Sequence, residues 1–393
     1  MTLISSACYL CGGNQTYDFF DLPPLPTQDG VMSSTKINAL GAVRGAIQLR
    51  HCKTCGYVGN EGHDSAKVSF DDYDFSNDNS PMYSRYTQEL CDRLIGRYDL
   101  NLKSIVDIGC GDGEFLRALC TLGNNKGVGI DPGFDHSTGV QDSGEDIAFL
   151  REYYSQEHAK FQSDLVTSRH VISISNDPLT LVRLIRKNLA QKSQAVVYFE
   201  TPNVRYTFGQ KIIWNVAYEH RSWFSTESLR YLIELAGFEV LDIDLCWNDT
   251  FLYVEARPTD TFVPPRKPDP DKLIDLERDI RGFSAGFLEL MEAHTCKISE
   301  IKAQGKKTIA WGAGARAVTY FNLFELSQEV PCIVDVNEKR QGKYLPGSGQ
   351  EIVAPEFIQT YQPELVIITN PTYEVEIREQ VQRLGINPEF WVL

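Results

Sequence analysis

Short apolar runs alternate with amphipathic segments between residue 104 and about residue 256. The runs have the length of buried strands, and the segments between them carry apolar residues at the three- and four-residue spacing of a helix that covers a sheet. This alternation predicts a parallel sheet with helices on its faces, closed by an antiparallel hairpin. The expected strands are residues 104–108, 126–130, 164–172, 194–200, 238–246 and 250–256, and the expected helices are residues 113–122, 178–189 and 226–236.

Different patterns precede and follow this segment. An extended proline-rich stretch at residues 19–28 and an alternating strand at residues 46–50 predict a small N-terminal module. A long amphipathic helix is expected at about residues 271–303, and a second series of strand, glycine turn and helix follows it. We predict an N-terminal module at residues 1–70, a central domain at residues 71–257, a proline-rich linker at residues 258–272 that forms neither helix nor central strand, and a smaller Rossmann-like domain at residues 273–393.

The first strand of the central segment leads into a loop with three alternate glycines, Gly109, Gly111 and Gly113, two residues after Asp107. Glycine has no Cβ, so a ligand can approach this backbone closely, and the helix that follows offers free N–H groups. Asp131 follows the next strand, where it can accept hydrogen bonds from a ribose. The combination predicts a cofactor that contains a nucleoside. An ordinary strand-to-helix turn in an NAD-type fold is the alternative.

Four of the ten cysteines form two C-x-x-C pairs, Cys8 with Cys11 and Cys52 with Cys55. A glycine follows each pair, which suits the tight turn that directs two sulfur atoms at one metal ion. Four thiolates fill a tetrahedral Zn²⁺ site and leave no position for water, so a structural role is expected. A redox dithiol, which needs only one pair, and an iron–sulfur cluster are the alternatives.

Composition narrows the classes of partner. The chain has 393 residues, which favours two or three domains, and 42% of them are hydrophobic, as in a globular protein. A formal net charge of −15 with no long basic run argues against binding nucleic acid. The first residues contain neither the basic segment nor the long apolar core of a signal peptide. No stretch of about eighteen residues is apolar throughout, as a membrane-spanning helix would require. We therefore expect a cytoplasmic protein that binds no membrane, as a monomer or homodimer.

The glycine loop resembles motif I of class I S-adenosylmethionine-dependent methyltransferases. With three parts in this order, the whole chain resembles the C-methyltransferases that act on nucleotide-linked deoxysugars. The resemblance is carried by the two cysteine pairs and by residues 107–113, 200–203, 219–225, 311–314 and 342–347. It implies an α/β fold, in which a class I methyltransferase doubly wound sheet is flanked by a small N-terminal zinc-binding module and a smaller C-terminal Rossmann-like domain. It also implies S-adenosylmethionine as cofactor and a nucleotide sugar as substrate.

Methyl transfer to a carbon beside a sugar ketone, which the resemblance implies, needs a base for the α-proton and a donor for the enolate oxygen. His220 is the candidate base because imidazole titrates near neutrality, and Glu219 lies beside it. Tyr218 is a candidate donor. Tyr73, in a polar stretch before a helix expected at about residues 84–98, is a second phenol. A solvated turn at Glu219 and an exposed loop tyrosine are the structural alternatives.

Two segments depart from the pattern of this family. At residues 217–220 the family usually has Tyr-His-Glu-His, whereas the first two positions in this chain are Ala217 and Tyr218. At residues 170–174 the family usually has His-Val-Leu-Glu-His, whereas the last position in this chain is Ile174. Either Tyr218 and His170 take over the missing roles, with His170 assigned here to the cofactor site, or the acceptor differs. Methylation of oxygen or nitrogen in a related metabolite and a non-catalytic binding module therefore stay as alternatives.

The C-terminal segment carries a second glycine turn at Gly312 and Gly314, and Asp335 follows its second strand. The resemblance implies that this part helps to hold the nucleotide sugar, with Arg316 and Tyr344 near a pyrophosphate or base. Packing between helix and strand, or between domains, would explain the same residues equally well. A dehydrogenase is less favoured because the turn lacks the third glycine of the dinucleotide fingerprint.

Overall fold

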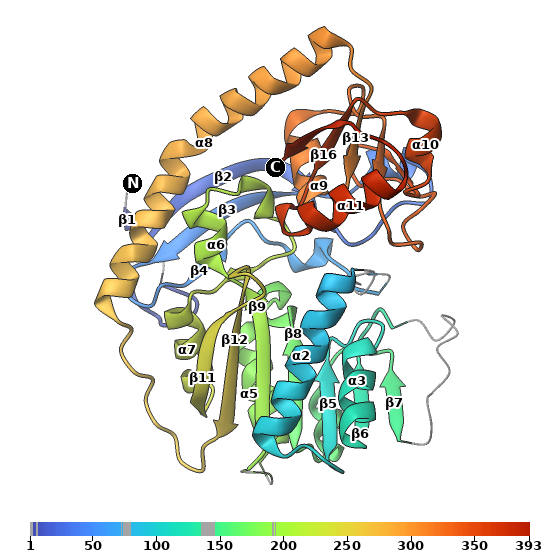
Figure 1. Cartoon of the computed structure of the whole chain (residues 1–393). Helices are drawn as coiled ribbons and strands as arrows, with labels where there is room; N and C mark the ends of the chain where they lie inside the picture. Colours follow the sequence, from blue (N-terminus) through green and yellow to red (C-terminus); the bar gives the residue numbers. More distant parts are fainter. Residues whose placement is uncertain are drawn as a thin grey trace.

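The computed structural model describes residues 3–4, 7–71, 73, 80–134, 146–190, 192 and 194–393, which form three sheets (Figure 1). The N-terminal sheet is antiparallel, with the order β1-β2-β3-β4-β10. Its elements are β1 (Leu3–Ile4), β2 (Thr16–Pro26), β3 (Arg44–Cys52), β4 (Val58–Asn60) and β10 (Ser222–Trp223), with the short helix α1 (Lys36–Leu40) between β2 and β3. Its last strand therefore comes from the middle of the chain.

The central sheet has seven strands in the order β11-β12-β9-β8-β5-β6-β7. The strands are β5 (Ser104–Ile108), β6 (Lys126–Ile130), β7 (Ile147–Leu150), β8 (Leu165–Arg169), β9 (Val196–Pro202), β11 (Phe238–Cys246) and β12 (Phe251–Pro258). The helices are α2 (Pro81–Tyr98), α3 (Glu114–Gly123), α4 (Val171–Ile174), α5 (Pro178–Asn188), α6 (Val204–Gly209) and α7 (Thr226–Leu235). Strands β5 to β9 pair in parallel, and β12 pairs antiparallel with β9 and β11. The predicted doubly wound sheet with its closing hairpin is confirmed.

The predicted end of one strand is wrong. The strand expected at residues 164–172 ends at Arg169, because His170 adopts a positive φ of 63° and the next four residues form α4. The long helix expected at about residues 271–303 is present as α8 (Pro270–Gln304), and proline is compatible with its first turn. The edge strand β7 has no counterpart among the predicted strands, and most of the polar stretch before α2 lies outside the described residues.

The C-terminal sheet is parallel throughout, with the order β15-β14-β13-β16-β17. Its strands are β13 (Thr308–Trp311), β14 (Cys332–Val334), β15 (Glu351–Val353), β16 (Leu365–Ile368) and β17 (Glu389–Val392), and its helices are α9 (Ala315–Phe324), α10 (Phe357–Tyr361) and α11 (Glu374–Arg383). The predicted Rossmann-like arrangement of strand, glycine turn and helix is present in β13 and α9. The 35-residue helix α8 leads into this sheet.

Helix α8 runs along the outside of the N-terminal sheet and ends beside the C-terminal sheet (Figure 1). Phe20 of β2 packs edge to face on Phe283 of α8, with ring centroids 4.7 Å apart. One apolar cluster contains these two rings together with Val318 and Tyr320 of α9. Burial of such large side chains stabilises the contact between the N-terminal and C-terminal parts. None of the helices in the described part of the chain combines the length and apolar character needed to cross a membrane.

Candidate functional site

A cavity of about 300 Å³ lies where the three parts of the chain meet. Its central wall includes His170 after β8 and Pro202 at the end of β9, and its C-terminal wall includes Gly312 after β13 and Asp335 after β14. All four lie at the carboxyl ends of parallel strands, which is the edge at which α/β sheets bind ligands. Asp29 and its neighbours, which follow β2, complete the cavity. Two ligand-binding edges therefore face each other across one space.

The central glycine loop has the backbone that its sequence predicts. Gly109, Gly111 and Gly113 adopt φ values of 74°, 54° and 81°, a region in which glycine is favoured. The carboxylate of Asp131 bridges the loop to the following turn, because it accepts hydrogen bonds from the amides of Gly111 at 2.9 Å and Gly133 at 2.7 Å. A Cβ built on Gly111 meets no described atom within 4 Å. The loop thus presents open backbone beside a half-buried carboxylate.

Asp107 lies beneath this loop. Its side chain is 3% exposed and accepts a 2.7 Å hydrogen bond from the Thr167 hydroxyl of β8. Burial raises the pKa of Asp107 to about 6. The structure therefore places Asp107 as a support of the loop inside the sheet, with little surface left for a ligand.

The C-terminal glycine turn repeats these contacts. Asp335 accepts hydrogen bonds from the amides of Ala313 at 2.7 Å and Asn337 at 2.8 Å, as Asp131 does from its own loop and turn. Arg316 lies in the first turn of α9 and lines the cavity, and its Nη1 atom is buried with no hydrogen-bond partner among the described residues. Arg340 also lines the cavity and lies 3.7 Å from Asp335. Two guanidinium groups therefore stand beside a second nucleotide-type turn.

Two carboxyl groups and one phenol meet on the N-terminal side of the cavity. The Tyr73 hydroxyl donates to Glu219 Oε2 and lies 3.1 Å from Asp29 Oδ1. The amide of Asp29 donates to Glu219 Oε1 at 2.5 Å. Burial raises the pKa of Glu219 well above its usual range, and the neighbouring Asp29 raises it further. The structure thus brings together two predicted residues, Tyr73 and Glu219, with one that the sequence did not indicate.

His220 and His170 both line the cavity. Burial, followed by the influence of His170, lowers the pKa of His220 to about 4, and its Nδ1 atom has no hydrogen-bond partner among the described residues. His170 Nε2 lies 2.9 Å from Glu200 Oε1. Burial opposes ionisation of Glu200, but Arg169 and His170 hold the pKa of Glu200 below its usual range. His220 is therefore a neutral imidazole at neutral pH, whereas His170 is oriented by a buried carboxylate.

Tyr218 does not line the cavity, which corrects its assignment as a donor there. Its hydroxyl accepts a hydrogen bond from the amide of Asp64 at 2.8 Å, and its ring packs on Gly45 and stacks on His63. The side chain points into the N-terminal part because its two neighbours, which alternate with it along the chain, face the cavity. Tyr344 is also absent from the cavity wall and forms a backbone bridge with Ser33.

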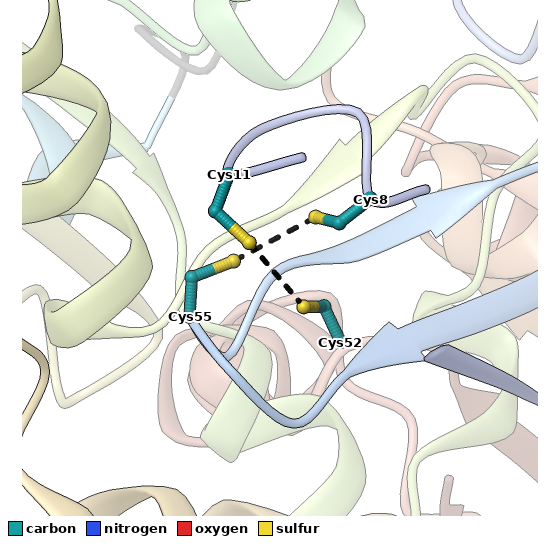
Figure 2. Close-up of side chains that lie close together, drawn as sticks. All are labelled: Cys8, Cys11, Cys52 and Cys55. Carbon is teal, nitrogen blue, oxygen red and sulfur yellow. Dashed lines mark hydrogen bonds between the residues drawn. The ribbon is translucent and has the colours of Figure 1, made fainter. Parts of the chain in front are cut away.

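The four paired cysteines converge at one point (Figure 2). The sulfur atoms of Cys8 and Cys55 are 3.7 Å apart, those of Cys11 and Cys52 are 3.6 Å apart, and all four lie within 4.8 Å of one another. Four sulfurs at roughly 2.3 Å from a tetrahedral Zn²⁺ ion would be separated by roughly 3.8 Å. The cluster therefore has the dimensions of a metal site, and none of its members lines the cavity.

Several cavity residues had no recognisable signature in the sequence. Asp29 follows a proline-rich strand, and Arg340 and Trp247 lie in loops whose residues carry no periodic pattern. Trp247 adopts a positive φ of 49° in the turn between β11 and β12, where its ring packs on Tyr83 and Tyr373.

Comparison with known proteins is consistent with this arrangement. Residues 83–243 match a family model described as a methyltransferase domain, and residues 273–391 match a model described as a C-methyltransferase C-terminal domain. The chain is 23% identical to the C-methyltransferase NovU of Streptomyces niveus over 392 residues, which covers 94% of this chain and 90% of that protein.

Solved methyltransferase structures align with less than half of the chain. A putative S-adenosylmethionine-dependent methyltransferase from Listeria monocytogenes is 14% identical, with 45% of this chain and 100% of that chain covered and a TM-score of 0.37. A Burkholderia thailandensis 1,6-didemethyltoxoflavin-N1-methyltransferase with bound S-adenosylhomocysteine is 12% identical, with 46% and 82% covered and a TM-score of 0.36.

Proposed function

Since the chain is an S-adenosylmethionine-dependent methyltransferase, we propose that it methylates a carbon atom beside the ketone of a nucleotide-linked sugar. The observation that carries the proposal is the single cavity in which a neutral histidine, a buried acid pair and a nucleotide-type turn face one another. The similarity to NovU along nearly the whole chain supports carbon as the acceptor. A small polar substrate is also consistent with a cavity of about 300 Å³.

In this proposal the central glycine loop holds the cofactor. The open space above Gly111 accommodates the methionine part. Asp131 accepts hydrogen bonds from the ribose, since among the described residues each of its oxygens accepts from one amide and has a further lone pair. Bound S-adenosylmethionine supplies an electrophilic methyl group. Tyr73 links this site to the cavity, because its backbone lies against Gly133 while its hydroxyl reaches Glu219.

His220 is the proposed base. Its imidazole lines the cavity and is neutral at neutral pH, so it can accept the proton from the carbon beside the ketone. On the opposite wall, Arg316 and the turn at Asp335 are proposed to hold the diphosphate and nucleoside of the substrate. A partly buried guanidinium whose Nη1 has no acceptor in the described part of the chain suits a bidentate contact with phosphate.

A mass-spectrometric assay tests this function. The protein is incubated with S-adenosylmethionine and a panel of nucleotide-linked 4-keto and 3-keto sugars, and a product heavier by one methylene group is expected for at least one of them. The position of the new methyl group on carbon is then established by NMR. Absence of product from every ketosugar, with S-adenosylhomocysteine still bound, would contradict the proposal.

Methylation at oxygen or nitrogen is a second candidate. Ala217 and Ile174 line the cavity with apolar groups where the sugar C-methyltransferase pattern has a phenol and an imidazole. Transfer to a heteroatom needs a proton acceptor but no enolate. Incubation of the ketosugar in deuterium oxide without cofactor separates the two candidates, because only carbon chemistry exchanges the α-proton.

We also propose that the cysteine cluster holds a structural Zn²⁺ ion. Four thiolates leave no open coordination position, so the ion would stabilise the two turns that carry them and take no part in the reaction. Matching turns support this role, since the amide of Gly12 donates to the Cys8 carbonyl and the amide of Gly56 donates to the Cys52 carbonyl, both at 2.9 Å.

A further inference from the structure

The two carboxyl groups at the cavity, those of Asp29 and Glu219, form an acid pair that needs one proton more than the Tyr73 hydroxyl supplies. Tyr73 Oη lies within hydrogen-bond distance of both Asp29 Oδ1 and Glu219 Oε2. A phenol carries one proton and can donate it to one acceptor only. If both carboxyl groups were ionised, the second oxygen–oxygen contact would lack a proton. The arrangement therefore requires one more proton, held by one of the two carboxyl groups.

Burial makes this requirement strong. Asp29 is 6% exposed and Glu219 is 2% exposed, and two carboxylates that share a buried site repel each other. Burial raises the pKa of both groups, and each lies close enough to affect the other. Among the described residues, the groups from other elements that act most strongly on the pair are Tyr73 from the segment before α2 and Arg340 from the segment after β14. The positive charge of Arg340 favours one ionised carboxylate in the pair, beside one protonated carboxyl.

We propose that Asp29 and Glu219 hold one proton between them and donate it to the ketone oxygen of the substrate as the α-proton is removed, before the methyl group is transferred. The proposal rests on the proposed function and adds to it an acid supplied by the N-terminal part of the chain. Both residues line the cavity beside His220. The two residues before Glu219 supply no donor to the cavity, since Ala217 presents a methyl group and the Tyr218 hydroxyl points away.

The proton balance closes over one turnover. His220 takes the α-proton, the electrons of that C–H bond form a carbon–carbon double bond, and the ketone oxygen takes the proton of the acid pair. The resulting enol carbon then forms a bond to the methyl group as the methyl–sulfur bond breaks. The enol proton returns to the acid pair as the ketone re-forms. His220 releases the α-proton to solvent, so one proton leaves for each methyl group transferred.

Asp29→Asn and Glu219→Gln test the shared proton. Each substitution keeps the size of the side chain and removes the shared acid, so kcat is expected to fall about 10²- to 10⁴-fold. KM for the sugar and the affinity for S-adenosylhomocysteine should change by less than about threefold, because the lost proton stabilises only the transition state. As the pH is raised, the residual activity of Asp29→Asn should be lost at a lower pH than the activity of the wild type. The reason is that Asp29 raises the pKa of Glu219, and the substitution removes this like-charged neighbour.

Infrared difference spectroscopy provides a readout without substrate. The wild-type protein at neutral pH should show a protonated-carboxyl band that disappears in both variants. Asp21→Asn, an exposed position in the same N-terminal sheet, should remove only a carboxylate band and leave activity unchanged. A kcat within about threefold of wild type in both variants, or an unchanged protonated-carboxyl band, would overturn the shared proton.

The two proposals fail separately. If the protonated-carboxyl band behaves as described but no nucleotide ketosugar is methylated, the proposed function fails and the shared proton stands. If a ketosugar is methylated while the band is absent from the wild type, the shared proton fails and the proposed function stands. Circular dichroism of both variants shows whether the fold is retained, and only folded variants are compared.

Discussion

At the scale of single residues, the environment of His220 determines when it can act. Burial lowers the pKa of its imidazole to about 4, so the ring is neutral above that pH. An unburied histidine would change charge near pH 6.5. The group that accepts the α-proton in the proposed reaction is therefore available across the whole neutral range, and its protonation is confined to acid solution.

The pH profile of kcat/KM follows from this shift. Activity is expected to fall on the acid side near pH 4, because protonated His220 cannot accept the α-proton. His220→Asn should abolish most turnover without weakening binding of S-adenosylhomocysteine. An acid limb near pH 6.5 in the wild type, with the variant still active, would rule out His220 as the base.

The same shift has a consequence for stability. The folded chain keeps His220 neutral between about pH 6.5 and pH 4, whereas the unfolded chain takes up a proton there. The free energy of unfolding therefore falls as the pH is lowered through this window. Denaturant titrations of the wild type and His220→Asn at pH 7 and pH 5 measure the contribution, which should be smaller in the variant.

Gly111→Ala separates backbone strain from loss of ligand space. The φ of 54° at this position costs a non-glycine residue about 1–2 kcal/mol. A Cβ there meets no atom of the described residues within 4 Å, so the chain should still fold. Binding of S-adenosylhomocysteine, measured by calorimetry, should weaken at least about tenfold because the methyl group enters the ligand's space. Gly96→Ala in α2, also in open space, is the control and should bind normally.

At the scale of elements, one ion pair joins the glycine loop of the central sheet to the loop after β14. Lys339 Nζ lies 2.6 Å from Asp112 Oδ2, and both side chains are partly exposed. Such pairs contribute about 0–1 kcal/mol to stability. The position of this pair matters more here, because it joins the loop proposed to hold the cofactor to the segment that follows β14.

Lys339→Ala should therefore leave the melting temperature nearly unchanged. It should weaken binding of S-adenosylhomocysteine a few-fold at low ionic strength, and the difference from wild type should vanish at high salt, where exposed charges are screened. Lys302→Ala, which removes a comparable pair with Glu329 at 2.8 Å, should have no effect on the affinity. An affinity for Lys339→Ala equal to wild type at low salt would show that the contact is incidental.

The elements also show which features a sequence can predict. β5, β6 and β11 occur at the residues predicted from their apolar runs, because buried strands leave a continuous apolar pattern. β8 ends earlier than predicted because the chain turns at His170, whose φ is positive, and Val171 then packs so closely on Gly109 that a side chain there would overlap it. β10 could not be predicted, since two residues form a strand only when β4 lies beside them.

The residues of the candidate site also fall into those that a sequence pattern indicates and those that it does not. The glycine loop, Asp131 and the cysteine pairs have fixed spacing, so their chemistry is visible in the sequence. Asp29 and Arg340 reach the cavity only through the tertiary arrangement, and nothing in their neighbours indicates it. Tyr218 was misplaced because adjacent residues on an extended segment point in opposite directions, and the sequence does not say which direction faces the ligand.

At the scale of the whole molecule, the proposed metal site supports the cavity through strand pairing. Cys52 ends β3, β3 pairs with β4, and β4 pairs with β10, which begins two residues after His220. The segment that carries the proposed base is thus fixed to the cysteine-bearing sheet. The metal would act on the reaction only through this mechanical connection.

Cys11→Ser tests the connection. Loss of one thiolate should remove bound zinc, measured by elemental analysis, and lower the free energy of unfolding by several kcal/mol, since structural zinc sites contribute on the order of 10 kcal/mol. Activity should fall in proportion to the folded fraction of the protein, and a lower temperature that restores the folded fraction should restore the activity. Cys296→Ser, an exposed cysteine on α8, should change neither zinc content nor stability. A zinc-free Cys11→Ser protein of wild-type stability would contradict the structural role.

The strand β10 also affects synthesis of the chain. When residues 58–60 leave the ribosome, the strand that pairs with their outer edge, residues 222–223, has not yet been made. Until then β4 has open backbone donors and acceptors along that edge, and unpaired strand edges promote association between chains. The nascent protein must therefore keep its N-terminal sheet protected for more than 150 further residues. Yield in the cell would depend on chaperone capacity and on translation rate across the central segment.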